Sequence, residues 1–154
     1  MHVVIQRVQR AEVRSEGLTL GAIGPGALAL VGIGLGDDSS VAERMADKVA
    51  GLRIYEDANG QTNLSLADTG GALLAVSQFT LEADLRRGRR PSFTAAAPPE
   101  VAQPLIAMFC ARLREHGLTV EEGRFGARME VELVNDGPFT VIVDSERDLG
   151  PIRP

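Results

Sequence analysis

The sequence is poor in histidine, cysteine and aromatic residues. Its 154 residues include one cysteine, two histidines and no tryptophan, and aromatic residues make up 4% of the chain. A single cysteine cannot form an internal disulfide, so the composition favours the reducing cytoplasm. With so few sulfur and imidazole ligands, we expect no metal site.

The short motifs of the best-known catalytic sites are also missing. There is no G-x-S-x-G nucleophile elbow, no H-E-x-x-H zinc site, no C-x-x-C pair and no P-loop. Cys110 lies in a helical pattern between Phe109 and Ala111, which favours a buried packing role over a reactive one. His2 stands at the terminus, and His116 ends the same helical pattern, where an imidazolium suits the helix dipole. A catalytic site in this chain must work without these groupings.

Long uncharged runs are limited to one stretch, which does not fit a membrane helix. Residues 17–36, GLTLGAIGPGALALVGIGLG, carry no charge and are long enough to cross a bilayer. Seven of them are glycine and Pro25 interrupts the run, so a helix would be unstable there. Two strands joined by a turn at 24–26 fit better. The polar N-terminal residues do not fit a signal peptide, so we expect a soluble, intracellular protein.

The excess of acidic residues limits the kinds of partner. The formal net charge is −5, which argues against indiscriminate nucleic-acid binding but allows a local basic patch. RRGRRPSF, residues 86–93, contains Arg86, Arg87, Arg89 and Arg90. Such a run is most often a solvated loop, and phosphate binding is the alternative. If all four arginines met RNA phosphates, log K would fall with log salt at a slope of about −3.

The hydrophobic periodicity predicts a single α+β domain over residues 1–154. Strands are predicted at 2–13, 18–23, 27–33, 52–57, 61–66, 72–81, 129–134 and 139–144. One helix is predicted at 38–52, where Ser40 and Glu43 form a capping box, and another from about 100 to 116, ended by Gly117. The excess of strands favours antiparallel-rich β-sheets with two main helices packed on one side.

Two short segments are candidates for a functional site, although neither is specific alone. VSQFTL, residues 76–81, places two hydroxyls and an amide at the end of a strand, where such groups often only bond to the backbone. NDGPFT, residues 135–140, is a natural turn. Its Gly137–Pro138 bond can be cis at modest cost, and glycine adopts backbone angles closed to other residues. Such a pair can aim its carbonyl groups in a fixed direction.

Taken together, these segments resemble the D-aminoacyl-tRNA deacylases, formerly called D-tyrosyl-tRNA deacylases. The likeness runs from VVIQRV and IGPGALALVGI through LRIYED, NLSL, VSQFTL and GRRPSF to FGARM and NDGPFT. No single block is decisive, but S-Q-F-T and N-x-G-P-x-T at this separation are highly specific together. The resemblance implies an ester hydrolase that removes D-amino acids from the acceptor end of tRNA. On this resemblance, such an enzyme would serve translational proofreading in the cytoplasm and would need neither a metal nor a cofactor.

The resemblance also implies a homodimer whose active sites are shared between subunits. The catalytic signature maps onto Ser77, Gln78, Phe79 and Thr80. Gly137 and Pro138 match a cis Gly-Pro motif that enters the partner's pocket. Its carbonyl groups stand where the side chain of an L-amino acid would go. They would admit D-residues of any kind, and glycine as well, including glycine mischarged on alanine tRNA.

Further matches surround these two signatures. Arg7 corresponds to the arginine that holds the Gly-Pro motif, and Asn135 belongs to the same motif. Phe125 and Met129 match positions around the terminal adenosine of the tRNA. Phe139 stands where many members have a smaller aliphatic residue, a departure that concerns the local packing of the turn.

The implied chemistry accounts for the missing base. An aminoacyl ester is already activated, and the resemblance assigns activation of the attack to the 2′-OH of the substrate. Backbone N–H groups around Phe79 and Thr80 would stabilise the developing oxyanion. A nucleophilic Thr80 is the alternative, disfavoured because no residue is evidently placed to deprotonate it.

Other classes of function remain open on the sequence alone. One is a related tRNA-editing domain of different amino-acid selectivity. Another is a non-catalytic RNA- or ligand-binding dimer of the same fold. A third is a structural interaction domain in which both motifs are merely turns.

Overall fold

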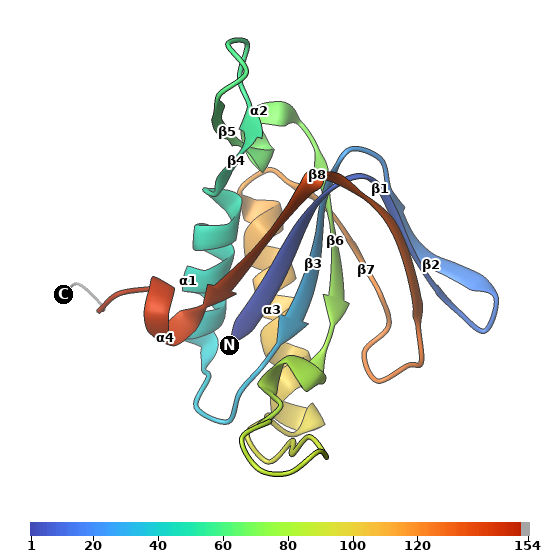
Figure 1. The fold of residues 1–154 in the computed structure, drawn as a ribbon, viewed down its shortest axis with the longest axis vertical. Helices are drawn as coiled ribbons and strands as arrows, with labels where there is room; N and C mark the ends of the chain where they lie inside the picture. The colour runs from blue at the N-terminus through green and yellow to red at the C-terminus, as the bar shows by residue number, and fades with distance from the viewer. Residues whose placement is uncertain (152–154) are drawn as a thin grey trace.

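Strand β1 (His2–Ser15) is the centre of the fold in the computed structural model, which describes residues 1–151. Its first half pairs antiparallel with β3 (Gly26–Gly32) and its second half with β2 (Leu18–Ile23). Along its other edge it pairs with β8 (Glu130–Asp144), which curves over the sheet (Figure 1).

The sheet continues from β3 into two parallel strands. β6 (Ala72–Ser77) pairs parallel with β3, and β7 (Thr119–Glu122) pairs parallel with β6. β4 (Arg53–Glu56) and β5 (Thr62–Ser65) form a separate antiparallel hairpin. This hairpin projects at one end of the molecule, above α1 in Figure 1.

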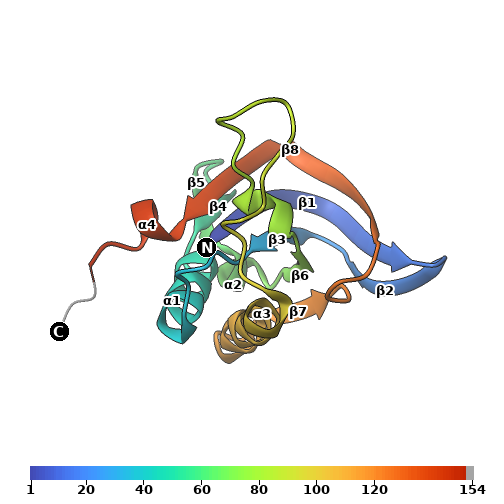
Figure 2. The same ribbon diagram turned by 90° about the horizontal axis from the view of Figure 1, so that it is seen from below.

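Both long helices cover the same face of the sheet (Figure 2). They are α1 (Ser39–Ala50) and α3 (Pro99–Glu115), and two one-turn helices, α2 (Leu66–Thr69) and α4 (Ser145–Asp148), lie in connections. Phe109 and Cys110 of α3 are fully buried against Met45 of α1 and the sheet. Burial raises the pKa of the Cys110 thiol to about 12, which agrees with a packing role.

Strand β6 is apolar without alternation because both of its faces are buried. Leu73 and Ala75 belong to the main core under the helices, whereas Leu74 and Val76 belong to a second, smaller core on the other face. Successive side chains of a strand point to opposite faces, so a strand buried on both faces needs apolar residues throughout.

The predicted α+β class is confirmed, and the predicted 52–57/61–66 hairpin is present with shortened strands. The structure differs in that β7 was not predicted and adds a parallel pairing. The capping box at Ser40 and Glu43 was wrong. Asp38 caps α1 instead, since its Oδ1 accepts the Val41 N–H at 3.0 Å.

Two strand boundaries were also predicted wrongly, both near the candidate motifs. The strand predicted at 72–81 ends at Ser77, because β3 ends at Gly32 and leaves no partner, and Phe79–Glu82 forms a 3₁₀ helix. The strands predicted at 129–134 and 139–144 are one strand, β8, whose register with β1 shifts on either side of Val8.

A cluster of charged side chains joins the two long helices. Asp47 of α1 accepts hydrogen bonds at its Oδ1 from Arg112 Nε at 2.7 Å and from His116 Nε2 at 2.6 Å. The Arg112 bond is the main cause of a lowered pKa of Asp47. A depressed folded-state pKa stabilises the protein above the ordinary value of 3.8, and this stabilisation is lost as pH falls through the folded value.

We therefore expect Asp47→Asn to lower the free energy of unfolding by about 0.5–1 kcal/mol at pH 7, the range of exposed ion pairs. Urea denaturation at pH 7 and pH 3 measures the difference, which should be smaller at the lower pH, because pH 3 lies below the ordinary pKa of 3.8 and closer to the lowered folded-state pKa. Glu43→Gln, an exposed change on the same helix, is the control. An equal loss at both pH values would contradict the assignment.

Candidate active site

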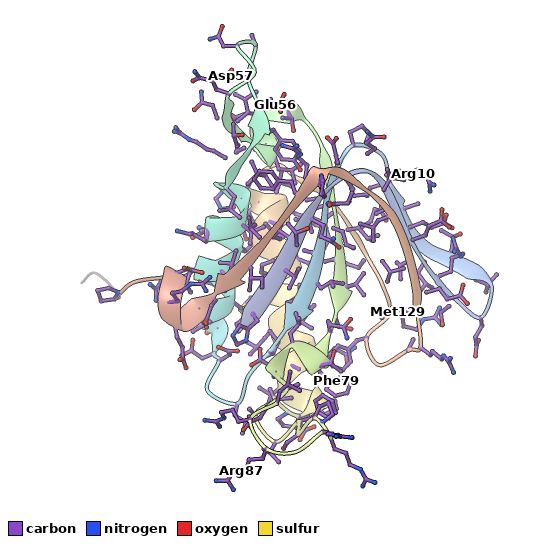
Figure 3. The ribbon with its side chains drawn as sticks, in the orientation of Figure 1. Arg10, Glu56, Asp57, Phe79, Arg87 and Met129 are labelled. Carbon is purple, nitrogen blue, oxygen red and sulfur yellow. The ribbon has the colours of Figure 1, made fainter. Side chains whose placement is uncertain are left out.

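A cavity of about 520 Å³ opens where β6 ends. Ser77, Gln78 and Phe79 line it together with Phe125, Met129 and apolar residues of β3 and α3. Phe79 and Met129 lie at the same end of the molecule in Figure 3. The structure thus brings together five residues that the sequence analysis assigned to two different roles. A mostly apolar cavity of this size accommodates a group as large as a nucleoside.

The SQFT segment changes from strand to 3₁₀ helix within the cavity wall. The Gln78 N–H donates to the Val31 carbonyl at 2.7 Å, the last bond to the sheet. Phe79 and Thr80 begin the 3₁₀ helix, and their N–H groups donate no hydrogen bond within residues 1–151. The first N–H groups of a helix have no intrahelical acceptor, so these two donors are free to bind another group.

The Thr80 hydroxyl is exposed and has one hydrogen-bond partner among the described residues. Gln78 Nε2 donates to it. No His, Asp or Glu side chain in that part of the chain bonds to this oxygen. The geometry therefore provides Thr80 with no direct base.

A buried carboxylate holds the other end of the same 3₁₀ helix. Glu82 is 9% exposed, and its Oε1 lies 2.9 Å from His2 Nδ1. A side-chain carbon added at Gly32 or Gly34 would lie 3.2 Å from the Glu82 carboxylate oxygens, so two glycines of the neighbouring segment make room for it. Glu82 was not predicted, since an acid ending a short apolar run gives no signal of a partner 80 residues away.

Arg7 holds the NDGP segment from the central strand. It is 8% exposed, its Nε donates to the Asp136 carbonyl at 3.1 Å and its Nη1 to the Ile54 carbonyl at 2.7 Å. Its guanidinium also lies over the Phe139 ring, 4.8 Å from the centroid. The residue that departs from the family pattern is thus packed against the arginine.

Asn135 and Gly137 determine the shape of the same segment. Asn135 Nδ2 donates to the Arg7 and Phe139 carbonyls, and its Oδ1 accepts the Phe139 N–H at 3.1 Å. These bonds replace the missing ladder contacts, which is why β8 continues through the predicted turn. The Gly137–Pro138 bond is cis, and Gly137 has φ +127°. A Cβ at Gly137 would also lie 3.0 Å from Arg7 Nη2, so only glycine fits.

The two candidate motifs lie far apart within one chain. The sheet register places Arg7 level with Leu73 on β6, four residues before Ser77. That offset is about 13 Å along the strands, and β8 lies three strands, about 14 Å, from β6. Gly137 and Pro138 are exposed and cannot reach the SQFT segment of their own chain.

The arginine-rich segment forms a loop that is closed at its base. Asp84 and Ser92 exchange two backbone hydrogen bonds, at 2.7 and 3.0 Å. Arg86 folds back onto Asp84 with an Nη2–Oδ2 distance of 2.7 Å, and its hydrogen bond lowers the pKa of Asp84 to about 2. The tip at 87–90 is exposed, and its three arginines form no ion pair within residues 1–151. Arg86 thus differs from the other three.

A buried phenol beside the NDGP segment also escaped prediction. The Tyr55 hydroxyl is buried without a hydrogen-bond partner in the described part of the chain. Burial raises its pKa, with Arg7 and Asp136 close enough to influence it. Tyr55 lies in the LRIYED block that carried the family likeness, but nothing in the pattern indicated its position beside Arg7.

Two kinds of site are absent from residues 1–151. No helix there combines the length and apolarity of a membrane span. No group of three or more His, Cys, Asp or Glu side chains there is arranged to hold a metal ion. The candidate site consists of backbone, hydroxyl, amide and aromatic groups.

Known proteins share both the sequence and the fold. The family model for D-Tyr-tRNA(Tyr) deacylase matches residues 4–144. Proteins named D-aminoacyl-tRNA deacylase from Symbiobacterium thermophilum and Anaeromyxobacter dehalogenans are each 55% identical over 147 residues. They cover 96% of this chain and 97% and 99% of their own lengths.

Solved structures of other proteins have the same fold as this chain. The c-Myc DNA Unwinding Element Binding Protein is 38% identical, with a TM-score of 0.88 over 94% of this chain and 98% of its own. A probable eukaryotic D-amino acid tRNA deacylase has the same fold at 17% identity, with a TM-score of 0.79 over 92% of this chain and 97% of its own. The resemblance found in the sequence is confirmed: the chain belongs to the D-Tyr-tRNA(Tyr) deacylase family.

Proposed function

We propose that this protein hydrolyses the ester bond of D-aminoacyl-tRNA, releasing the D-amino acid and the tRNA. It acts as a homodimer in which the Gly137–Pro138 segment of one subunit closes the cavity of the other. The supporting observation is the separation of the two motifs: an apolar cavity beside SQFT at one end of the sheet, and an exposed, rigidly held segment at the other. Two chains allow them to meet.

The terminal adenosine of the tRNA occupies the cavity. Phe125 and Met129 provide an aromatic ring and a polarisable thioether against the adenine. Ser77 and Gln78, at the cavity edge, orient the ribose and the ester. This arrangement puts the scissile carbonyl near the start of the 3₁₀ helix.

Chirality is selected by main-chain carbonyl groups. Arg7 and Asn135 fix the segment that carries Gly137 and Pro138, so its carbonyls form a rigid fence. A D-residue turns its side chain away from this fence, whatever that side chain is, whereas an L-residue collides with it. Glycine has nothing to collide, so glycyl-tRNA, including glycine mischarged on alanine tRNA, is cleaved to some extent.

The chemistry relies on the substrate for its activating group. The neighbouring 2′-OH of the ribose activates the attack of water on the ester. The free N–H groups of Phe79 and Thr80 stabilise the oxyanion, each worth about 2.7–4 kcal/mol by analogy with a single oxyanion-hole donor. Thr80 orients and does not attack, because no base contacts its hydroxyl.

Two alternative functions are tested against this proposal. One is a tRNA-editing domain with a different amino-acid selectivity, and the other is a non-catalytic RNA- or ligand-binding dimer. The decisive experiment incubates the protein with tRNA carrying D-tyrosine or L-tyrosine and follows ester loss against spontaneous hydrolysis. We expect the D-ester to be cleaved more than about 200-fold faster, above what one methylene contact discriminates. Equal rates would refute the fence, and no release of either would leave a binding module.

The 2′-OH is tested with D-tyrosyl-tRNA that ends in 2′-deoxyadenosine. We expect the rate to fall by about 10²-fold or more, in line with the loss of one acid–base group. Thr80→Val, which keeps the shape but removes the hydroxyl, should cost much less on the normal substrate. Near-normal cleavage of the deoxy substrate combined with an inactive Thr80→Val would instead establish threonine as the nucleophile.

The arginine loop is tested through the salt dependence of tRNA binding. Because Asp84 neutralises Arg86, we expect three phosphate contacts from this loop in place of four. Replacing Arg87, Arg89 and Arg90 by alanine should reduce the slope of log K against log salt by about 2. Arg86→Ala is the matched control and should leave the slope nearly constant. An unchanged slope in the triple variant would return the loop to plain solvation.

A further inference from the structure

Two aromatic side chains lie exposed at the mouth of the cavity. Phe79 is 57% exposed and Phe93 is 39% exposed. Their ring centroids are 5.1 Å apart and the ring planes meet at 69°. Phe79 lines the cavity, whereas Phe93 does not. The pair therefore extends the aromatic surface of the cavity outward.

Phe93 is held in place by its backbone. It follows Ser92, which is tied to Asp84 by two hydrogen bonds, and its own carbonyl accepts the Ala96 N–H at 3.1 Å. The segment after it is joined to the loop after β3, since Ala95 O accepts the Leu35 N–H at 2.9 Å. The exposure of Phe93 is thus a property of a well-anchored segment.

Positive charge lies in the same loop. Phe93 comes three residues after the arginine-rich tip at 87–90, whose guanidinium groups form no ion pair within residues 1–151. Figure 3 shows Arg87 beyond Phe79 at this end of the molecule. Aromatic faces beside an unpaired positive track are how proteins bind unpaired nucleotides, since every base has a face to stack and every linkage carries a phosphate.

We propose that Phe79 and Phe93 form a stacking platform for the unpaired nucleotide that precedes the terminal adenosine of the tRNA. This inference rests on the proposed function and deepens it. The cavity of about 520 Å³ has room for one nucleoside, so the preceding base lies outside. At the mouth, that base meets the exposed aromatic faces while its phosphate lies toward the arginine tip.

In the proposed dimer the partner's Gly137–Pro138 segment closes the cavity, and the charge argues against a contact of the aromatic pair with the same face of a second copy. In a symmetric contact through this face, the unpaired arginines at 87–90 of each copy would approach those of the other. An anionic strand gains from the same charges. The aromatic pair and the arginines are therefore explained together by a nucleic-acid ligand.

The test compares three substrates that differ in length or in the middle base. They are D-tyrosyl-adenosine, the D-tyrosyl ester of the trinucleotide CCA, and the same trinucleotide with an abasic sugar in place of the middle cytidine. KM and kcat are measured for the wild-type protein and for Phe93→Ala and Phe93→Leu, with Leu18→Ala as an exposed apolar control on the distant β1–β2 turn.

We expect the wild-type protein to prefer CCA over adenosine, and Phe93→Ala to reduce this preference in KM by about tenfold. Phe93→Leu should behave like Phe93→Ala, because leucine has no aromatic face. The abasic trinucleotide should lose the preference in the wild type and respond no further to Phe93→Ala. Leu18→Ala should match the wild type throughout.

An unchanged KM preference in Phe93→Ala would overturn the platform while leaving the deacylase proposal intact. A shift of the monomer–dimer equilibrium in Phe93→Ala, measured by sedimentation, without a change in the KM preference would also overturn the platform. That result would assign the two aromatic side chains to the subunit interface. If the wild-type protein cleaves none of the substrates, nor D-tyrosyl-tRNA, the proposed function fails and the platform with it.

Discussion

The buried guanidinium of Arg7 is the contact on which the arrangement of this molecule depends. A charge that is 8% exposed is costly unless its donors are used, and here they bond to the carbonyls of Ile54 and Asp136. One side chain of the central strand thereby joins the β4–β5 hairpin to β8 and fixes the Gly137–Pro138 segment at the surface. Its guanidinium Nη2 would lie 3.0 Å from a Cβ at residue 137, and the positive φ of that residue also favours glycine. These buried hydrogen bonds hold an exposed segment of backbone rigidly, and a stereochemical fence requires such a segment.

The rest of the proposed mechanism follows from the lack of a base or strong nucleophile among the residues that line the cavity. The cavity is lined by apolar side chains, an amide and a hydroxyl, and a 3₁₀ helix whose first N–H groups are free begins at Phe79 in its lining. Such a site can hold and orient an activated ester, but it cannot generate a strong nucleophile. In the proposed mechanism, one subunit would provide the pocket, its partner would provide the fence, and the RNA would provide the hydroxyl that activates the attack.

Much of the secondary structure could be predicted from the sequence, because helices and strands follow from the spacing of apolar residues within a short segment. The period of Val41, Met45 and Val49 predicted α1, and the apolar pattern predicted a strand at 72–81, of which 72–77 is observed. What could not be predicted depends on contacts between distant segments. The 3₁₀ helix after Ser77 arises because β3 ends, and the continuity of β8 arises because Asn135 bonds across its own segment. The His2–Glu82 pair and the neutralisation of Arg86 by Asp84 likewise leave no periodic trace. The family resemblance provided the candidate residues, and the fold then showed which of them share a cavity.

The proposed mechanism requires Gly137 and Pro138 of one subunit to meet the cavity of the other. A crystal structure of the protein with an amide-linked D-tyrosyl-adenosine analogue, which cannot be hydrolysed as an ester, tests this most directly. The account predicts the adenosine against Phe125 and Met129, and the carbonyls of the partner's Gly137 and the partner's Pro138 beside the α-carbon of the D-tyrosyl group. Density that shows this segment facing solvent in both copies, with the ligand bound in a cavity formed by one chain alone, would contradict it.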